Sequence, residues 1–171
     1  MEKGNHFLTG ITFLAAAGAV AYTSYQPELN QYLPTIADKA VFAASFVVST
    51  SLPDIDQKIK GIPHRTITHS VWFLIPLILL GLAYNPLFGI FLAALHHIII
   101  DSFSSQGVAL LYPFQGYLKY DNGKSVKRGY HIKLYKNREA SEYICAILIS
   151  MVNSAIALMF LLDYFNLYNF F

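Results

Sequence analysis

Five apolar segments constrain the fold of this chain more than any other feature of its sequence. They span approximately residues 7–22, 36–52, 70–84, 86–103 and 143–165. A membrane-spanning helix needs about 20 mostly apolar residues, with ~17 as the lower end. Only 13% of the 171 residues are charged, whereas a soluble domain has about 25%. We therefore predict an all-α polytopic membrane bundle of about five transmembrane or membrane-embedded helices, folded as a single domain over residues 1–171.

Two parts of this topology allow more than one interpretation. The second segment is the weakest, because Asp38 and Lys39 shorten its apolar run, and it could be tilted or only partly inserted. Residues 1–21 also resemble a secretory signal, since a basic start and an apolar run precede Ala19-Val20-Ala21.

Lysine and arginine are distributed unevenly between the loops. If the amino terminus is cytoplasmic and all five segments span, Lys39 is the only one of the 12 basic residues that lies outside. Cytoplasmic loops are enriched in Lys and Arg, so we predict a multi-pass protein of the inner (cytoplasmic) membrane with its N-terminus inside. The basic residues 117–138 contain the turn signal Asp121-Asn122-Gly123, which predicts a short cytoplasmic loop or hairpin. The net charge of +2 is too small to indicate a nucleic-acid partner.

Ionisable residues cluster where the apolar segments begin or end. Such groups are costly at membrane depth and usually mark function. In the five-span topology four clusters lie at the cytoplasmic mouth of the bundle. In chain order they contain His6; Asp54 and Asp56; His64 and His69; and His97 and Asp101.

The spacing of these residues suits metal binding. His97 and Asp101 are four apart, so a helix presents both on one face. Asp54 and Asp56 are two apart, and an extended chain after Pro53 would place both carboxylates on one side. One zinc ion takes about four ligands, so the seven residues could hold one or two ions with shared carboxylates. Mixed His and Asp ligands favour Zn²⁺, with Mn²⁺ or Fe²⁺ as alternatives.

Each cluster also has a purely structural interpretation. His6 could cap a helix, the two aspartates could form a turn or an N-cap, and His64 could belong to a basic loop facing lipid headgroups. His97 with Asp101 is the hardest pair to explain without a ligand. His96 projects about 100° away from His97, so we predict that it either supports a metal ligand or has a packing role.

Two further residues are candidates for catalysis. The planar guanidinium of Arg65 suits phosphate oxygens, so Arg65 is a candidate phosphate clamp. Glu142 opens the last segment and is either a charge favoured by the helix dipole or a site residue that could act as a general base.

The combination and order of these motifs resemble the YdjM family of bacterial and archaeal membrane proteins. The motifs are Gly4-Asn5-His6, Leu52-Pro53-Asp54-Ile55-Asp56, His64-Arg65 with Thr68-His69-Ser70, and His97 and Asp101 with Gly107-Val108 and Tyr112-Pro113, within roughly residues 4–145. Members are described as LexA-binding, inner-membrane-associated, metal-dependent hydrolases. The resemblance implies that the seven His and Asp residues match the family's polar positions, and that Glu142 stands where such proteins tend to carry a glutamate.

These observations lead to two functional hypotheses. The first is a membrane-embedded, metal-dependent hydrolase of a phosphoester, in a lipid or lipid-linked substrate, that uses metal-activated water at the cytoplasmic membrane face. The second is a non-enzymatic membrane protein whose structural metal ties helix ends together and which acts through a protein partner that the sequence does not identify.

Overall fold

The computed structural model describes residues 3–24, 26–60, 62, 64–104, 107–114, 119–121, 124–126 and 139–164. Its α-helices are α1 (Lys3–Ser24), α2 (Gln26–Tyr32), α3 (Ile36–Ser49), α4 (Val71–Ala83), α5 (Phe88–Ser102) and α6 (Ala140–Tyr164). Its 3₁₀ helices are η1 (Leu52–Lys58), η2 (Ile67–His69) and η3 (Asn85–Leu87), and its strands are β1 (Lys119–Asp121) and β2 (Lys124–Val126). Five of the α-helices correspond to the five apolar segments, which confirms the predicted all-α membrane helix bundle.

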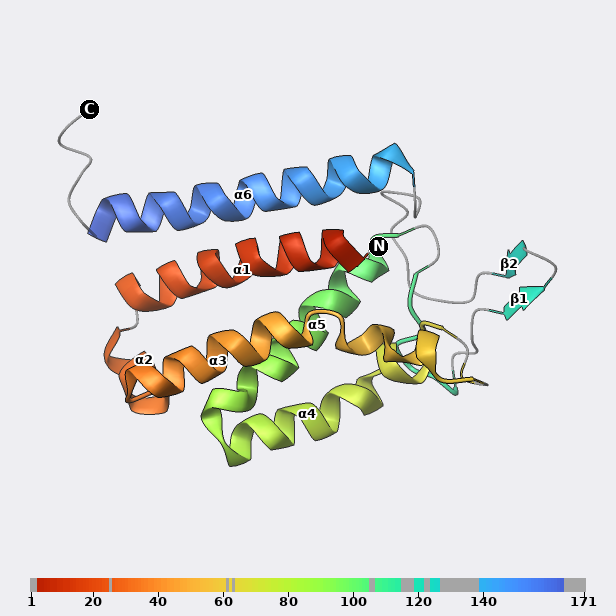
Figure 1. The fold of residues 1–171 in the computed structure, drawn as a ribbon, viewed down its shortest axis with the longest axis horizontal. Helices are drawn as coiled ribbons and strands as arrows, with labels where there is room; N and C mark the ends of the chain where they lie inside the picture. The colour runs from red at the N-terminus through yellow and green to blue at the C-terminus, as the bar shows by residue number, and fades with distance from the viewer. Residues whose placement is uncertain are drawn as a thin grey trace.

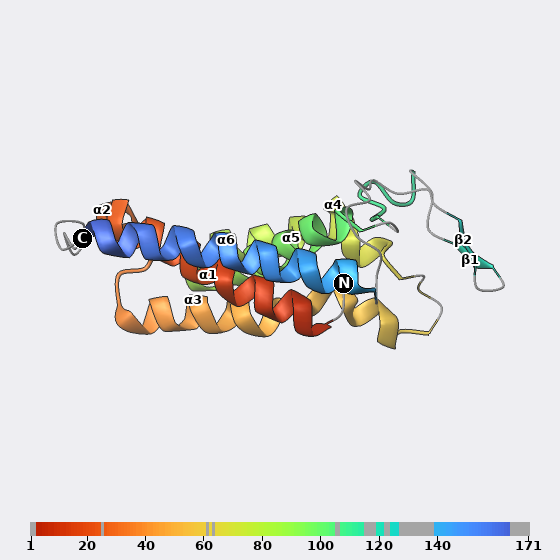
Figure 2. The same cartoon turned by 90° about the horizontal axis from the view of Figure 1, so that it is seen from above.

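The long helices lie side by side in an elongated bundle (Figures 1 and 2). α1 packs along α6, and α5 packs against α3 and α4. The first turn of α1, the last turn of α3, the first turn of α4, the last turn of α5 and the first turn of α6 all lie at one end of the bundle (Figure 1). η1, η2 and the β-hairpin lie at that same end, so the fold gathers the four polar clusters there.

Within the described residues, four helical segments are long and apolar enough to cross a membrane. They are Gly4–Ser24, Ile36–Lys58, Asn85–Ser102 and Ala140–Met159. The third apolar segment forms the shorter helix α4, of 13 residues. The segment that we predicted to be weakest is therefore not the shortest, because η1 continues the run of α3 to Lys58.

The charges near the start of α3 have a structural role in the helix terminus. The Thr35 hydroxyl accepts a hydrogen bond from the Asp38 backbone N–H, and the Asp38 carboxylate accepts one from the Thr35 backbone N–H, each at 3.0 Å. This reciprocal capping box satisfies amide groups that a helix start leaves unpaired. Lys39 extends to the side-chain oxygen of Asn30, 2.7 Å away. Asp38 and Lys39 therefore lie at the start of α3 and do not interrupt the helix.

Glycines allow α1 and α5 to approach α3 closely. A Cβ atom on Gly10 would lie 2.7 Å from Cγ2 of Thr50, and a Cβ on Gly89 would collide with the Phe42 carbonyl oxygen and the Ser45 hydroxyl. Small residues of this kind permit close packing of membrane helices. The Gly10 contact is linked to the site described below, because the Thr50 carbonyl oxygen contacts His97.

The described strands fall within the segment for which we predicted a loop or hairpin. β1 pairs antiparallel with β2, with Lys119 opposite Val126 and Asp121 opposite Lys124. Residues 127–138 lie outside the described part of the chain.

Candidate metal centre

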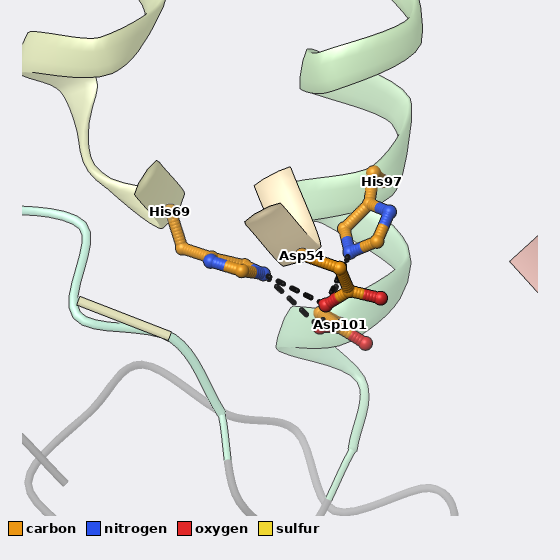
Figure 3. A group of neighbouring side chains, drawn as sticks. All are labelled: Asp54, His69, His97 and Asp101. Carbon is orange, nitrogen blue, oxygen red and sulfur yellow. Dashed lines mark ion pairs between the residues drawn. The ribbon is translucent and has the colours of Figure 1, made fainter. Parts of the chain in front are cut away.

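Four buried side chains from three elements converge at the polar end of the bundle. They are Asp54 from η1, His69 from η2, and His97 and Asp101 from α5. One donor atom from each lies within 4.8 Å of the donor atoms of the other three. Their exposed fractions are 4% for Asp54 and 0% for the others. Figure 3 shows the rings of His69 and His97 approaching the two carboxylates from different directions.

The distances within this group suit an ion better than hydrogen bonds. The Nε2 atoms of His69 and His97 lie 3.5 and 3.6 Å from Oδ2 of Asp101, and 4.0 and 3.6 Å from Oδ1 of Asp54. Hydrogen bonds between such atoms would be about 2.7–3.2 Å long. Ligand atoms placed tetrahedrally about 2.1 Å from one zinc ion would be about 3.4 Å apart. The four nitrogen–oxygen separations, 3.5 to 4.0 Å, are close to this value.

The two imidazoles are oriented so that Nε2 is the atom that faces the carboxylates. Nδ1 of His97 lies 2.7 Å from the carbonyl oxygen of Thr50 and donates to it. Nδ1 of His69 lies 3.1 Å from the Thr68 hydroxyl. Neither Nε2 atom has a hydrogen-bond partner within the part of the chain that the structure describes. Metal-binding histidines commonly use one nitrogen for the ion and the other for such a partner, so both residues fit the role of ligand.

Asp56 lies beside the group of four and contacts both His64 and His69. Its Oδ1 is 2.8 Å from Nδ1 of His64, and its Oδ2 is 3.5 Å from Nδ1 of His69. Oδ2 also accepts hydrogen bonds from the Arg65 backbone N–H and the Thr68 hydroxyl. Both carboxylate oxygens of Asp56 are therefore engaged in orienting the segment that carries the histidines.

The predicted extended arrangement of the two aspartates is wrong. Pro53 lies in the first turn of the 3₁₀ helix η1. A proline is tolerated there because a backbone N–H in the first turn has no acceptor within the helix. At three residues per turn, Asp54 and Asp56 project in directions about 240° apart. Asp54 consequently faces His97, and Asp56 faces His64. Asp54, Asp56 and His64 nevertheless form a second group close enough to hold an ion, with Nε2 of His64 3.8 Å from Oδ1 of Asp54.

Arg65 is buried and supports the site from within the protein. Its Nη2 is 2.8 Å from Oδ1 of Asp101, and its Nη1 donates to the Ser104 hydroxyl and to the Gly107 carbonyl oxygen. Its backbone has φ of +63°, in the left-handed region that non-glycine residues rarely adopt. The side chain is 1% exposed and paired with Asp101, so Arg65 holds that carboxylate in place. Its role as a phosphate clamp stays a prediction.

The remaining predicted residues flank the centre. His6 stacks on His97 with ring centroids 3.7 Å apart, and its Nε2 is 3.3 Å from Oδ1 of Asp101. Glu142 is fully buried, and one of its oxygens accepts a hydrogen bond of 2.9 Å from the Asn5 side chain. His96 packs near Phe13, with ring centroids 5.0 Å apart, in agreement with the predicted packing role.

Sequence reasoning missed several partners of the site. Thr68 and Asn5 are direct neighbours of His69 and His6, so their polar side chains offered a signal. Ser104 follows Asp101 in a serine-rich turn, and this turn was a weaker signal. The Thr50 contribution is a backbone carbonyl, for which the side-chain sequence offers no signal.

The fold and this centre define the chain as a polytopic membrane helix bundle with a buried His/Asp cluster that could hold a metal ion. The family model described as YdjM inner membrane protein matches residues 1–168. The chain therefore belongs to that family, as its motifs indicated, and the family description agrees with the four apolar helices. Comparisons with curated proteins and with solved structures found no match.

Proposed function

We propose that this protein is a membrane-embedded, metal-dependent hydrolase of a phosphoester in a lipid or lipid-linked substrate. The observation that carries the proposal is the convergence of Asp54, His69, His97 and Asp101, whose donor atoms lie within 4.8 Å of one another. Two nitrogens and two carboxylate oxygens suit zinc, and also manganese or iron. A metal ion held there would polarise a phosphoryl oxygen and make water a nucleophile at neutral pH.

His64 is the residue that we assign to proton transfer. Its side chain is 24% exposed, whereas those of His69 and His97 are fully buried. Asp56 holds Nδ1 of His64, which leaves Nε2 directed toward Asp54 and 3.4 Å from the side-chain nitrogen of Gln57. An imidazole whose second nitrogen is held by a carboxylate is a suitable general base. His64 would alternatively complete the second ion position with Asp54 and Asp56.

The same arrangement supports a location of the centre at the cytoplasmic membrane surface. Among the described lysines and arginines, Lys39 belongs to the end opposite the polar end of the bundle. The others belong to the polar end: Lys3, Lys58, Lys60, Arg65, Lys119 and Lys124. Short cytoplasmic loops are the ones enriched in Lys and Arg. A substrate with a polar head at this surface and an apolar tail in the bilayer would suit such a position.

The experiment is a phosphate-release assay on detergent-purified protein loaded with Zn²⁺ or Mn²⁺. The substrates are a soluble aryl phosphate, phosphatidic acid and a polyprenyl phosphate, and His97→Ala is the background control. We expect metal-dependent release from at least one lipid phosphate and none from the variant. Equal release by the two proteins on every substrate would overturn the proposal.

A second function is favoured by one observation, the burial of the four donor residues, which are at most 4% exposed. A closed four-ligand site is typical of structural zinc, whereas catalytic sites keep one position open. The alternative is therefore a structural metal in a protein that acts through a protein partner. It predicts one tightly held ion, no hydrolysis, and loss of the folded state when the ion is removed.

A further inference from the structure

A recess opens on the outer side of the metal centre, where α3 passes into η1. It has a volume of about 250 Å³, and its lining residues are Val48, Ser51, Leu52, Asp54, Ile55 and Lys58. Asp54 thus belongs both to this recess and to the group of metal-binding candidates. The recess and the candidate metal centre therefore share a wall at Asp54.

The lining combines one cation, Lys58, and one carboxylate, Asp54, with an apolar track. Val48 is 82% exposed and Ile55 is 42% exposed. Val48, Leu52 and Ile55 all line the recess, so they lie on the same side of the α3–η1 segment. This segment belongs to the candidate membrane span Ile36–Lys58. In a membrane, an exposed apolar track on a spanning segment contacts acyl chains.

Lys58 ends that span and is exposed. A lysine at the end of a membrane helix extends its ammonium group toward the headgroup layer. The recess is also smaller than the ~300–1,000 Å³ of pockets that enclose a whole drug-sized molecule. It therefore suits a compact charged headgroup whose tails remain outside in the bilayer.

We propose that this recess binds the phosphate headgroup of an anionic membrane lipid, with Lys58 at the phosphate and an acyl chain along Val48 and Ile55. The occupant is a lipid, because the track beside the cation is apolar and lies on a membrane-spanning segment. Since Asp54 is part of the wall, the bound headgroup would lie next to the metal centre. That last step rests on the proposed function, whereas lipid binding itself does not.

The test measures binding of a short-chain phosphonate analogue of phosphatidic acid, which a hydrolase cannot cleave, to the metal-loaded full chain in neutral detergent. Titration calorimetry is run on wild type, Lys58→Ala and the matched control Lys60→Ala, whose side chain is exposed but does not line the recess. We expect saturable binding that is about fivefold weaker in Lys58→Ala, equivalent to about 1 kcal/mol per lysine near a lipid surface. Lys60→Ala should bind as wild type does.

Two further measurements identify the chemical group that binds and the recess as its binding site. Diacylglycerol with the same chains should not bind, and inorganic phosphate at the same concentration should not displace the analogue. Ser51→Phe fills the recess and should abolish binding while the metal content, measured on the same sample, stays at the wild-type value. The proposal is overturned if wild type shows no saturable binding, if the two lysine variants weaken binding equally, or if inorganic phosphate displaces the lipid.

Failure of this inference can be told apart from failure of the proposed function. Lys58-dependent lipid binding without hydrolysis of any lipid phosphate would refute the hydrolase and leave the lipid site standing. Metal-dependent hydrolysis of the soluble aryl phosphate without Lys58-dependent lipid binding would refute the lipid site alone.

Discussion

Nη2 of Arg65 lies 2.8 Å from Oδ1 of Asp101, and both side chains are 1% exposed. The two residues are 36 positions apart in the chain, so this buried ion pair joins the loop before η2 to the last turns of α5. It leaves Oδ2 of Asp101 directed at His69 and His97. The pair thereby connects the stability of the bundle end to the geometry of the candidate metal centre.

Arg65→Ala should destabilise the protein strongly, because it leaves the buried Asp101 carboxylate without its cation. Removing one partner of a buried ion pair costs about 3–5 kcal/mol. Thermal unfolding in detergent measures the loss, with Lys60→Ala as an exposed control. Arg65→Lys keeps the charge, but the lysine ammonium cannot contact Asp101, Ser104 and Gly107 at once. This variant should therefore fold, but it should bind metal more weakly than wild type does. Wild-type stability in Arg65→Ala would contradict this role.

Asp56→Asn should weaken metal binding without removing a residue of the central group of four. The amide cannot accept from Arg65, Thr68 and His64 as the carboxylate does, so His64 and His69 lose their fixed orientation. Loss of such supporting partners typically lowers metal affinity about 10- to 100-fold. A competition titration with a chelator measures the affinity. Asp38→Asn, at the opposite end of the same segment, is the matched control and should bind metal as wild type does.

His64→Ala should separate metal binding from turnover. If His64 transfers a proton, the variant should keep its metal while the turnover number falls by about 100- to 10,000-fold. Metal content and phosphate release are measured on the same preparation. Loss of metal together with activity would instead make His64 a ligand, in the second group with Asp54 and Asp56.

Gly10→Ala tests the link between helix packing and the site. The new methyl group would lie 2.7 Å from Thr50 Cγ2, so Thr50 must move, and its carbonyl oxygen holds His97. Overpacking of this kind costs about 1–3 kcal/mol. Gly18→Ala is the matched control on the same helix, because nothing lies within 4 Å of the added atom. Equal unfolding temperatures for the two variants would show that this contact is not tight.

The general architecture and much of the site could be predicted from local sequence patterns. Apolar length locates the helices, and the helical spacing of His97 and Asp101 places them on one face regardless of the tertiary structure. The polar clusters lie at the ends of apolar segments. Because one helix ends on the side of the bundle where the next begins, these clusters are predicted to meet. Each of these inferences depends on residues close together in the chain.

The errors came from contacts and conformations that local patterns do not encode. Asp54 and Asp56 diverge because Leu52–Lys58 forms a 3₁₀ helix, which the isolated sequence did not distinguish from an extended segment. The local pattern also does not show that Arg65 has a left-handed backbone conformation or that it donates to Ser104, 39 residues away. The continuation of α3 into η1 likewise made the second segment long enough to span.

The most direct test of the central claim is the metal content per chain of detergent-purified protein, for wild type, His97→Ala and His96→Ala. His96 is the adjacent histidine on α5 but packs near Phe13, so it controls for loss of an imidazole. We predict at least one equivalent of a transition metal in wild type and His96→Ala, and background levels in His97→Ala. Absence of bound metal from all three proteins after reconstitution with Zn²⁺, Mn²⁺ and Fe²⁺, or equal content in all three, would contradict the assignment of this centre.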